Sequence, residues 1–196
     1  MDRKLTTRVA IAFISLGLLT GTGCASRGGD RYHVVQAHRQ ANHEAARAKS
    51  DAALEAIEVR DFDAAEQLLL DAIAANVGFG PAHNNLGKVY YEQGKLYLAA
   101  WEFEYAIKLM PHHPEPRNNL ALVLETVRRF DESITHYEAA LDLEPDNPEL
   151  LGNLARAKLR RGDPPDEIKQ LLMDLVLKDS RPEWIDWANN ELAHMR

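Results

Sequence analysis

Three asparagines that recur at a fixed spacing are the side chains in this sequence best suited to specific recognition chemistry. Asn85, Asn119 and Asn153 lie 34 residues apart, and Asp51 stands one period earlier. An amide carries both a hydrogen-bond acceptor and donors. A row of amides can therefore pair with the backbone of an extended peptide and leave the choice of partner to neighbouring pockets. The other role open to these asparagines is structural, satisfying backbone groups of neighbouring elements.

Residue types that usually carry catalysis or bind metals do not form a recognisable set. The sequence has no Gly-rich phosphate loop, no nucleophile motif and no cysteine–histidine set at metal spacing. His33, His38 and His43 are five residues apart, about 140° beyond a full helical turn, so they do not share a face. We therefore expect no catalytic residues, no metal and no cofactor, and a function based on binding.

The charge balance argues against nucleic acid as the partner. The formal net charge is -7 over 196 residues. The first 23 residues carry three basic and one acidic side chain, so the remainder has a net charge of -9. Phosphate backbones are bound by basic surfaces. We expect a protein partner instead.

The asparagines belong to a longer pattern that indicates pairs of helices. After Asn85, the residues Leu86, Val89 and Tyr90 share one helical face at i, i+3 and i+4. Gly94 interrupts this helix, and Pro111 ends the next one, since proline cannot continue a helix. One such hairpin cannot bury its apolar face alone, so neighbouring hairpins must stack. The second helix places its small and apolar residues at i, i+4, i+7 and i+8: Ala99, Phe103, Ala106 and Ile107.

This pattern resembles the tetratricopeptide repeat (TPR) family, whose 34-residue unit has Leu-Gly, Tyr, Ala, Phe, Ala and Pro at fixed offsets. His83 stands where the family has tryptophan. The resemblance implies an all-α fold, a right-handed α-solenoid of about four helix-turn-helix repeats with N- and C-terminal capping helices. The family's offsets are filled here by Leu86, Gly87, Tyr90, Ala99, Phe103, Ala106 and Pro111.

The repeat pattern divides the predicted domain, residues 32–196, into successive units. In the fourth repeat the second helix regains its apolar period only after a one-residue shift, which Pro164-Pro165 accounts for. The last helix turns Trp184 inward as a cap; the alternatives are that its tryptophans bind a ligand or that the helix is exchanged between chains. Residues 32–45 lengthen the leading helix or cap the array. The predicted units are repeats 46–79, 80–113 and 114–147, a degenerate repeat 148–181, and a capping helix 182–196.

By the same resemblance, the first helices of the repeats line a concave groove in which a protein or extended peptide binds. The family's other mode, a cluster of basic residues clamping a terminal carboxylate, does not match the spacing of the basic residues here. A glycan or peptidoglycan fragment stacking on Tyr91 and Trp101 is the alternative ligand, although Trp101 is expected to pack within its hairpin. The predicted groove residues are Asn84, Asn85, Lys88, Tyr91, Asn118, Asn119, Asn153 and Arg156.

The N-terminus reads as an export signal. A basic start precedes an apolar run over 9–19, which is shorter than the ~20 residues needed to span a bilayer. Small residues then precede Cys24, the only cysteine, and this resembles a bacterial lipoprotein signal over 1–23, although Gly21 stands where that signal usually has leucine. The resemblance implies an acylated Cys24. The Ser-, Arg-, Gly- and Asp-rich composition that follows predicts a flexible tether over 24–31. An ordinary cleaved signal and an uncleaved anchor are the alternatives.

Together these features predict a scaffold anchored by lipid in the bacterial cell envelope, at the outer membrane and facing the periplasm. Small TPR lipoproteins often assist the assembly of envelope complexes. The resemblance implies support of a secretion system or of a pilus, of the Tad/Flp or type IV kind. A self-associating structural module is the alternative.

Overall fold

The computed structural model describes residues 28–195, and all regular structure in this range is helical. The predicted signal at 1–23 and Cys24 lie outside the described residues. No helix in the described part of the chain is long and apolar enough to cross a membrane. The helices are α1 (Gly28–Glu58), α2 (Phe62–Ala75), α3 (Gly80–Glu92), α4 (Leu96–Leu109), α5 (Glu115–Thr126), α6 (Phe130–Leu141), α7 (Pro148–Arg161), α8 (Pro165–Lys178) and α9 (Pro182–His194).

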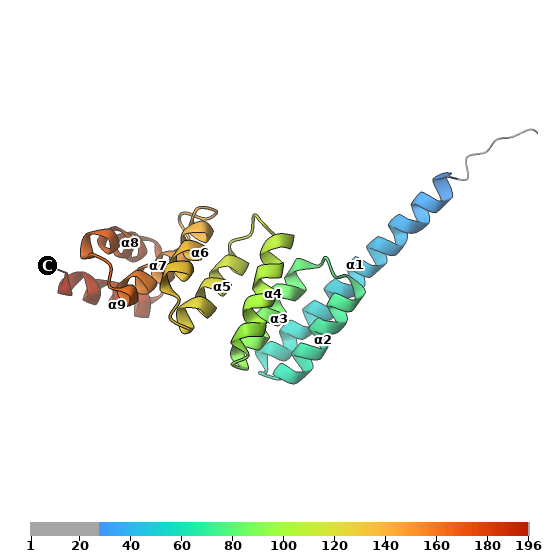
Figure 1. The fold of residues 1–196 in the computed structure, drawn as a ribbon, viewed down its shortest axis with the longest axis horizontal. Helices are drawn as coiled ribbons and strands as arrows, with labels where there is room; N and C mark the ends of the chain where they lie inside the picture. Colours follow the sequence, from blue (N-terminus) through green and yellow to red (C-terminus); the bar gives the residue numbers. More distant parts are fainter. Residues whose placement is uncertain (1–27, 196) are drawn as a thin grey trace, which may run out of the picture.

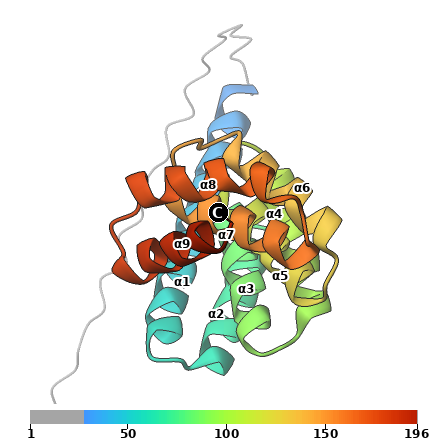
Figure 2. The ribbon, with the colours of Figure 1, turned by 90° about the vertical axis from the view of Figure 1, so that its left-hand side faces the viewer.

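Consecutive helices form antiparallel hairpins that stack into an elongated array (Figure 1). The first helices of successive hairpins, α1, α3, α5 and α7, contact one another in turn and form one layer. The second helices α2, α4, α6 and α8 form the other layer. Figure 2 views the stack from its C-terminal end, with α8 and α9 nearest the viewer. This arrangement confirms the predicted all-α solenoid.

The 34-residue period is visible in the core. Leu86, Leu120 and Leu154 occupy equivalent buried places, with exposed fractions of 1%, 2% and 3%. Gly87 lies beside the first of them, where a Cβ atom would be 2.6 Å from the ring of Phe103. The two helices of this hairpin therefore approach closely because the position has no side chain.

The turn inside each hairpin uses one residue in the left-handed backbone region. Gly94 and Gly162 fill this place in the second and fourth repeats, with φ of 74° and 94°. Arg60 and Arg128 fill it in the first and third, with φ of 59° and 63°. Glycine adopts this conformation freely, whereas a residue with a Cβ loses about 1 kcal/mol or more. Repeats one and three therefore carry backbone strain that the others avoid.

Two helices begin at places that the 34-residue repeat alone does not give. Helix α1 begins at Gly28, so residues 28–31 of the predicted tether are helical; no proline interrupts the helix before its end. Every residue from 35 to 45 is exposed, and Figure 1 shows this part of α1 projecting beyond the array. Helix α8 begins at Pro165, one residue later than the period requires. This shift places Ile168 and the leucines that follow it on the buried face.

Helix α9 takes the place of the first helix of another repeat. It begins at Pro182, which is 34 residues after Pro148 at the start of α7. The ring of Trp184 packs on Gly152, where a Cβ atom would lie 2.5 Å from the indole. Trp184 also meets Trp187 edge to face, with ring centroids 5.4 Å apart. The two tryptophans therefore close the end of the core against their own chain.

Candidate binding groove

The three asparagines that recur every 34 residues, Asn85, Asn119 and Asn153, make the same contact in successive repeats. Each donates its side-chain N–H to a residue 35 positions earlier, so the hydrogen bonds join the first helices of neighbouring hairpins. The donor and acceptor pairs are Asn85 Nδ2 to Ser50 Oγ at 3.3 Å, Asn119 Nδ2 to Asn84 Oδ1 at 3.0 Å, and Asn153 Nδ2 to Asn118 Oδ1 at 2.9 Å.

This geometry favours the structural role for most of the asparagines. Asn84 and Asn85 are each 8% exposed, and Asn118 and Asn153 are each 6% exposed. Their amides therefore offer little surface to a ligand. The series ends where Gly152 replaces the acceptor asparagine, because Trp184 occupies the space beside it. Asn119 is more accessible than the others and faces a cavity.

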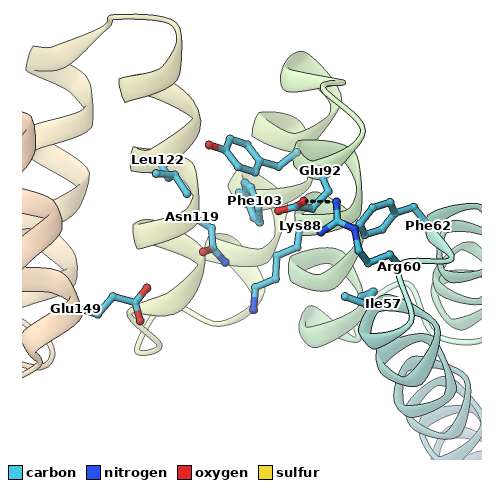
Figure 3. A pocket seen from close by; sticks show the side chains of 10 residues that line it. Ile57, Arg60, Phe62, Lys88, Glu92, Phe103, Asn119, Leu122 and Glu149 are labelled. Carbon is cyan, nitrogen blue, oxygen red and sulfur yellow. Dashed lines mark ion pairs between the residues drawn. The ribbon is translucent and has the colours of Figure 1, made fainter. Parts of the chain in front are cut away.

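That cavity, of about 410 Å³, lies along the first-helix layer (Figure 3). It reaches from the first repeat to the start of the fourth, because its wall includes side chains from α1, α3 and α5 and from the start of α7. A smaller cavity of about 120 Å³ shares Lys88, Asn119 and Glu149 with it and extends toward Leu150. We call the two together the groove. The larger cavity is lined by Ile57, Arg60, Phe62, Lys88, Tyr91, Glu92, Phe103, Asn119, Leu122 and Glu149.

The groove carries charges of both signs on an apolar wall. Within residues 28–195, Lys88 makes no side-chain hydrogen bond or ion pair, and it is exposed. Arg60 lies 3.8 Å from Glu92 across the groove's N-terminal end. At the other end, Glu149 Oε1 accepts a hydrogen bond from Asn118 Nδ2 at 3.2 Å. Such a surface can hold a polypeptide segment by charge and apolar contact.

Tyr91 lines the larger cavity, and its hydroxyl lies 3.2 Å from Thr126 Oγ1. The expectation that Trp101 packs within its hairpin is wrong: it is 60% exposed. Phe103 points into the hairpin, and a residue two positions away on a helix lies about 200° around the axis. Trp101 therefore faces away from Tyr91, and the two rings do not form one stacking site.

Arg156 belongs to a buried ionic network and is not a free groove cation. The carboxylate of Glu125 is 1% exposed and accepts hydrogen bonds from both Nε and NH2 of Arg156, at 3.1 Å each. Arg160 donates to the same carboxylate at 2.8 Å, and the Tyr137 hydroxyl donates at 3.0 Å. One acid thereby joins α5, α6 and α7.

The network shifts the pKa values of its members. Burial acts to raise the pKa of Glu125, but the hydrogen bonds and charge of Arg156 and the hydrogen bonds from Arg160 and Tyr137 outweigh it, so the pKa lies below its ordinary value. Burial raises the pKa of the Tyr137 hydroxyl, and the nearby Glu125 raises it further. Glu125 is therefore ionised and Tyr137 neutral at physiological pH. The pairing was missed in the sequence because its members are 31 and 35 residues apart.

His83 fills the place of the family's tryptophan with a polar contact. His83 is 6% exposed, and its ring packs at a tilt of 47° against the ring of Tyr105, with 4.6 Å between centroids. Nδ1 lies 2.7 Å from Glu102 Oε2, and Nε2 lies 3.0 Å from the carbonyl of Val77. In the described residues, no three acidic, histidine or cysteine side chains are grouped to hold a metal ion. His83 thus has a packing role between α3 and α4.

The fold defines a helical-repeat protein with a groove along its first helices. A sequence model of the tetratricopeptide repeat family matches residues 50–114 and 118–181, about two thirds of the chain. The chain belongs to that family. No curated protein sequence is significantly similar to it.

Several solved structures share the fold. The first TPR of Spaghetti (RPAP3), bound to the HSP90 peptide SRMEEVD, is 16% identical with a TM-score of 0.60, covering 62% of this chain and 96% of that one. YrrB, described as a TPR protein with an unusual peptide-binding site, is 16% identical with a TM-score of 0.61, covering 74% of this chain and 75% of that one. An O-GlcNAc transferase from Thermobaculum terrenum is 25% identical with a TM-score of 0.65, covering 69% of this chain but 26% of that one.

Proposed function

We propose that this protein is a scaffold that binds an extended segment of a partner protein in the groove. The observation that carries the proposal is the cavity of about 410 Å³ that reaches from the first repeat to the start of the fourth and contains the exposed Lys88. An elongated cavity with apolar walls and a few charged side chains suits a polypeptide, whose apolar side chains fill the wall while polar ones meet the charges.

The lining of the groove and the comparison with solved structures both support a peptide ligand. The lining combines the apolar side chains of Phe62 and Leu122 with the charged side chain of Lys88. Two of the solved structures that share the fold are themselves described by a bound peptide or a peptide-binding site. Those descriptions concern the other proteins, and the likeness to them is one of fold. The proposed partner is therefore a protein or peptide, with no nucleic acid and no cofactor.

We also propose that acylation of Cys24 holds the array at a membrane, at the outer membrane facing the periplasm. Helix α1 begins four residues after Cys24, and its 31 residues reach about 46 Å. Its exposed N-terminal part would hold the groove away from the lipid surface. Such a placement suits a protein that assists assembly of an envelope complex such as a pilus or a secretion system.

Selection from displayed random peptides tests the groove function. Peptides of about nine residues reach about 30 Å when extended, enough to lie along the groove. We expect the full-length protein to select a family of related peptides, and Leu122→Trp, which fills the cavity, to stop their binding. Leu98→Trp is the matched control, because Leu98 is exposed on α4 and does not line the cavity. Equal binding by the Leu122 variant, or no selected peptides at all, would contradict the proposal.

Replacement of Cys24 tests the anchor separately. Cys24→Ser should leave an uncleaved or released protein without acyl chains, because the sulfur that receives the lipid is gone. Membrane fractionation and mass spectrometry of the intact protein measure both properties. A serine variant that still partitions with the membrane at the processed mass would rule out acylation.

A further inference from the structure

The strained turn residue Arg60 points to a binding role. Glycine fills the same left-handed turn position in the second and fourth repeats, so the fold itself does not require arginine there. A residue kept in an unfavourable backbone conformation often serves function. Arg128 is the other arginine of the series. It has φ of 63° but does not line the groove. Arg60 does line it, at the N-terminal end.

The guanidinium of Arg60 is positioned but not neutralised by tight pairing. It lies over the ring of Phe62 at 5.2 Å from the centroid, which holds it at the groove wall. Its ion pair with Glu92 is long, at 3.8 Å, and both side chains are well exposed. Exposed pairs of this kind contribute little to stability. A ligand anion can therefore replace Glu92 without a large loss.

Lys88 supplies the second cation of the same cavity. Figure 3 shows its side chain in the cavity between Arg60 and Glu149, which lies on the opposite side. The carboxylate of Glu149 repels a second anion at that end. An acidic group would therefore be accepted where it replaces Glu92 beside Arg60 and be disfavoured near Glu149, so the groove distinguishes the two directions of a bound chain.

We propose that Arg60 and Lys88 form a subsite for one aspartate or glutamate side chain within the bound segment, oriented toward α1. This inference rests on the proposed peptide-binding function and specifies its ligand. The apolar wall of Ile57, Phe62 and Leu122 receives a neighbouring apolar side chain. A carboxylate is favoured over a phosphate because Glu92 and Glu149 match the two positive charges of Arg60 and Lys88, and a phosphate brings about two negative charges.

The selected peptides and two matched variants test the subsite. Arg60→Gly removes the guanidinium and relieves the backbone, whereas Arg128→Gly relieves the equivalent backbone outside the groove. We expect both variants to melt at or above the temperature of the unaltered protein. We expect Arg60→Gly alone to weaken peptide binding by about tenfold or more, as loss of a charge-assisted hydrogen bond does.

Replacement of the acidic residue in the peptide completes the test. With the unaltered protein, changing the selected acid to its amide should weaken binding by about tenfold, and with Arg60→Gly the same change should have little effect. Selected peptides without a common acid, or an amide effect that persists undiminished in Arg60→Gly, would overturn the subsite while leaving the groove function in place. Tighter binding of a phosphoserine peptide than of the acidic one would overturn the choice of carboxylate.

Discussion

Replacing Glu125 by alanine should loosen the C-terminal half of the array more than the N-terminal half. Glu125 is fully buried on α5 and accepts hydrogen bonds from Tyr137 on α6 and from Arg156 and Arg160 on α7. Without the carboxylate, three donors lose their acceptor at once. In an array of stacked hairpins each repeat contacts only its neighbours, so the damage should stay close to the third and fourth repeats.

The size of the effect follows from how each donor is buried. Breaking a buried ion pair from one side costs about 3–5 kcal/mol. The side chains of Arg156 and Arg160 are 30% and 48% exposed, so they regain water and the lower end applies. Tyr137 is fully buried and cannot regain water. We therefore expect a loss of about 3 kcal/mol, or a fall in melting temperature of about 6–12 °C for a chain of this size.

Urea denaturation followed by circular dichroism measures the loss, and hydrogen exchange locates it. Amides of α5, α6 and α7 should exchange faster in Glu125→Ala, while those of α2 and α3 keep their protection. Glu115→Ala is the control on the same helix, because Glu115 is exposed and its carboxylate lies 3.9 Å from the ring of His113. A Glu125 variant as stable as the Glu115 variant would refute the account of the network.

Two further predictions concern pH and packing. Because the folded pKa of Glu125 lies below its ordinary value of 4.5, its contribution is complete above about pH 4.5 and is lost as pH falls through the folded pKa. Stability measured from pH 6 to pH 3 should therefore fall less steeply in Glu125→Gln than in the unaltered protein, and equal slopes would contradict this. Gly87→Val should cost about 1–3 kcal/mol by forcing the Phe103 ring aside, whereas the same stability as the unaltered protein would mean that the hairpin has room to spare.

Much of the fold could be predicted because the same residue types recur every 34 positions. Leu86 and its equivalents, the breaks at Gly94 and Pro111 and the shift after Pro164 all depend on contacts within one hairpin or between neighbours. The one-residue delay of α8 follows from the apolar period of its own residues. The start of α1 was harder to predict, because residues 35–45 are exposed and no buried apolar face indicates where the helix begins.

The groove was predicted less well because its residues are shared between repeats. The asparagine amides bond at a spacing of 35, one more than the repeat, and this offset depends on how the hairpins stack. Arg156 looked free because its acid, Glu125, lies one repeat earlier on the neighbouring helix. The role of Arg60 had a readable signal: it aligns with Gly94, a place where the backbone favours glycine. Trp101 likewise sits about 200° from Phe103, which already directs it outward.

Hydrogen exchange of the full-length protein, with and without a selected peptide, tests the central claim most directly. If an extended segment lies in the groove, the added protection should fall on α3 and α5, whose side chains line the cavity, and on the turn that holds Arg60. The protection of the backbone amides of α4 and α6 should be unchanged by the peptide. Protection confined to those outer helices, or spread evenly along the array, would contradict groove binding.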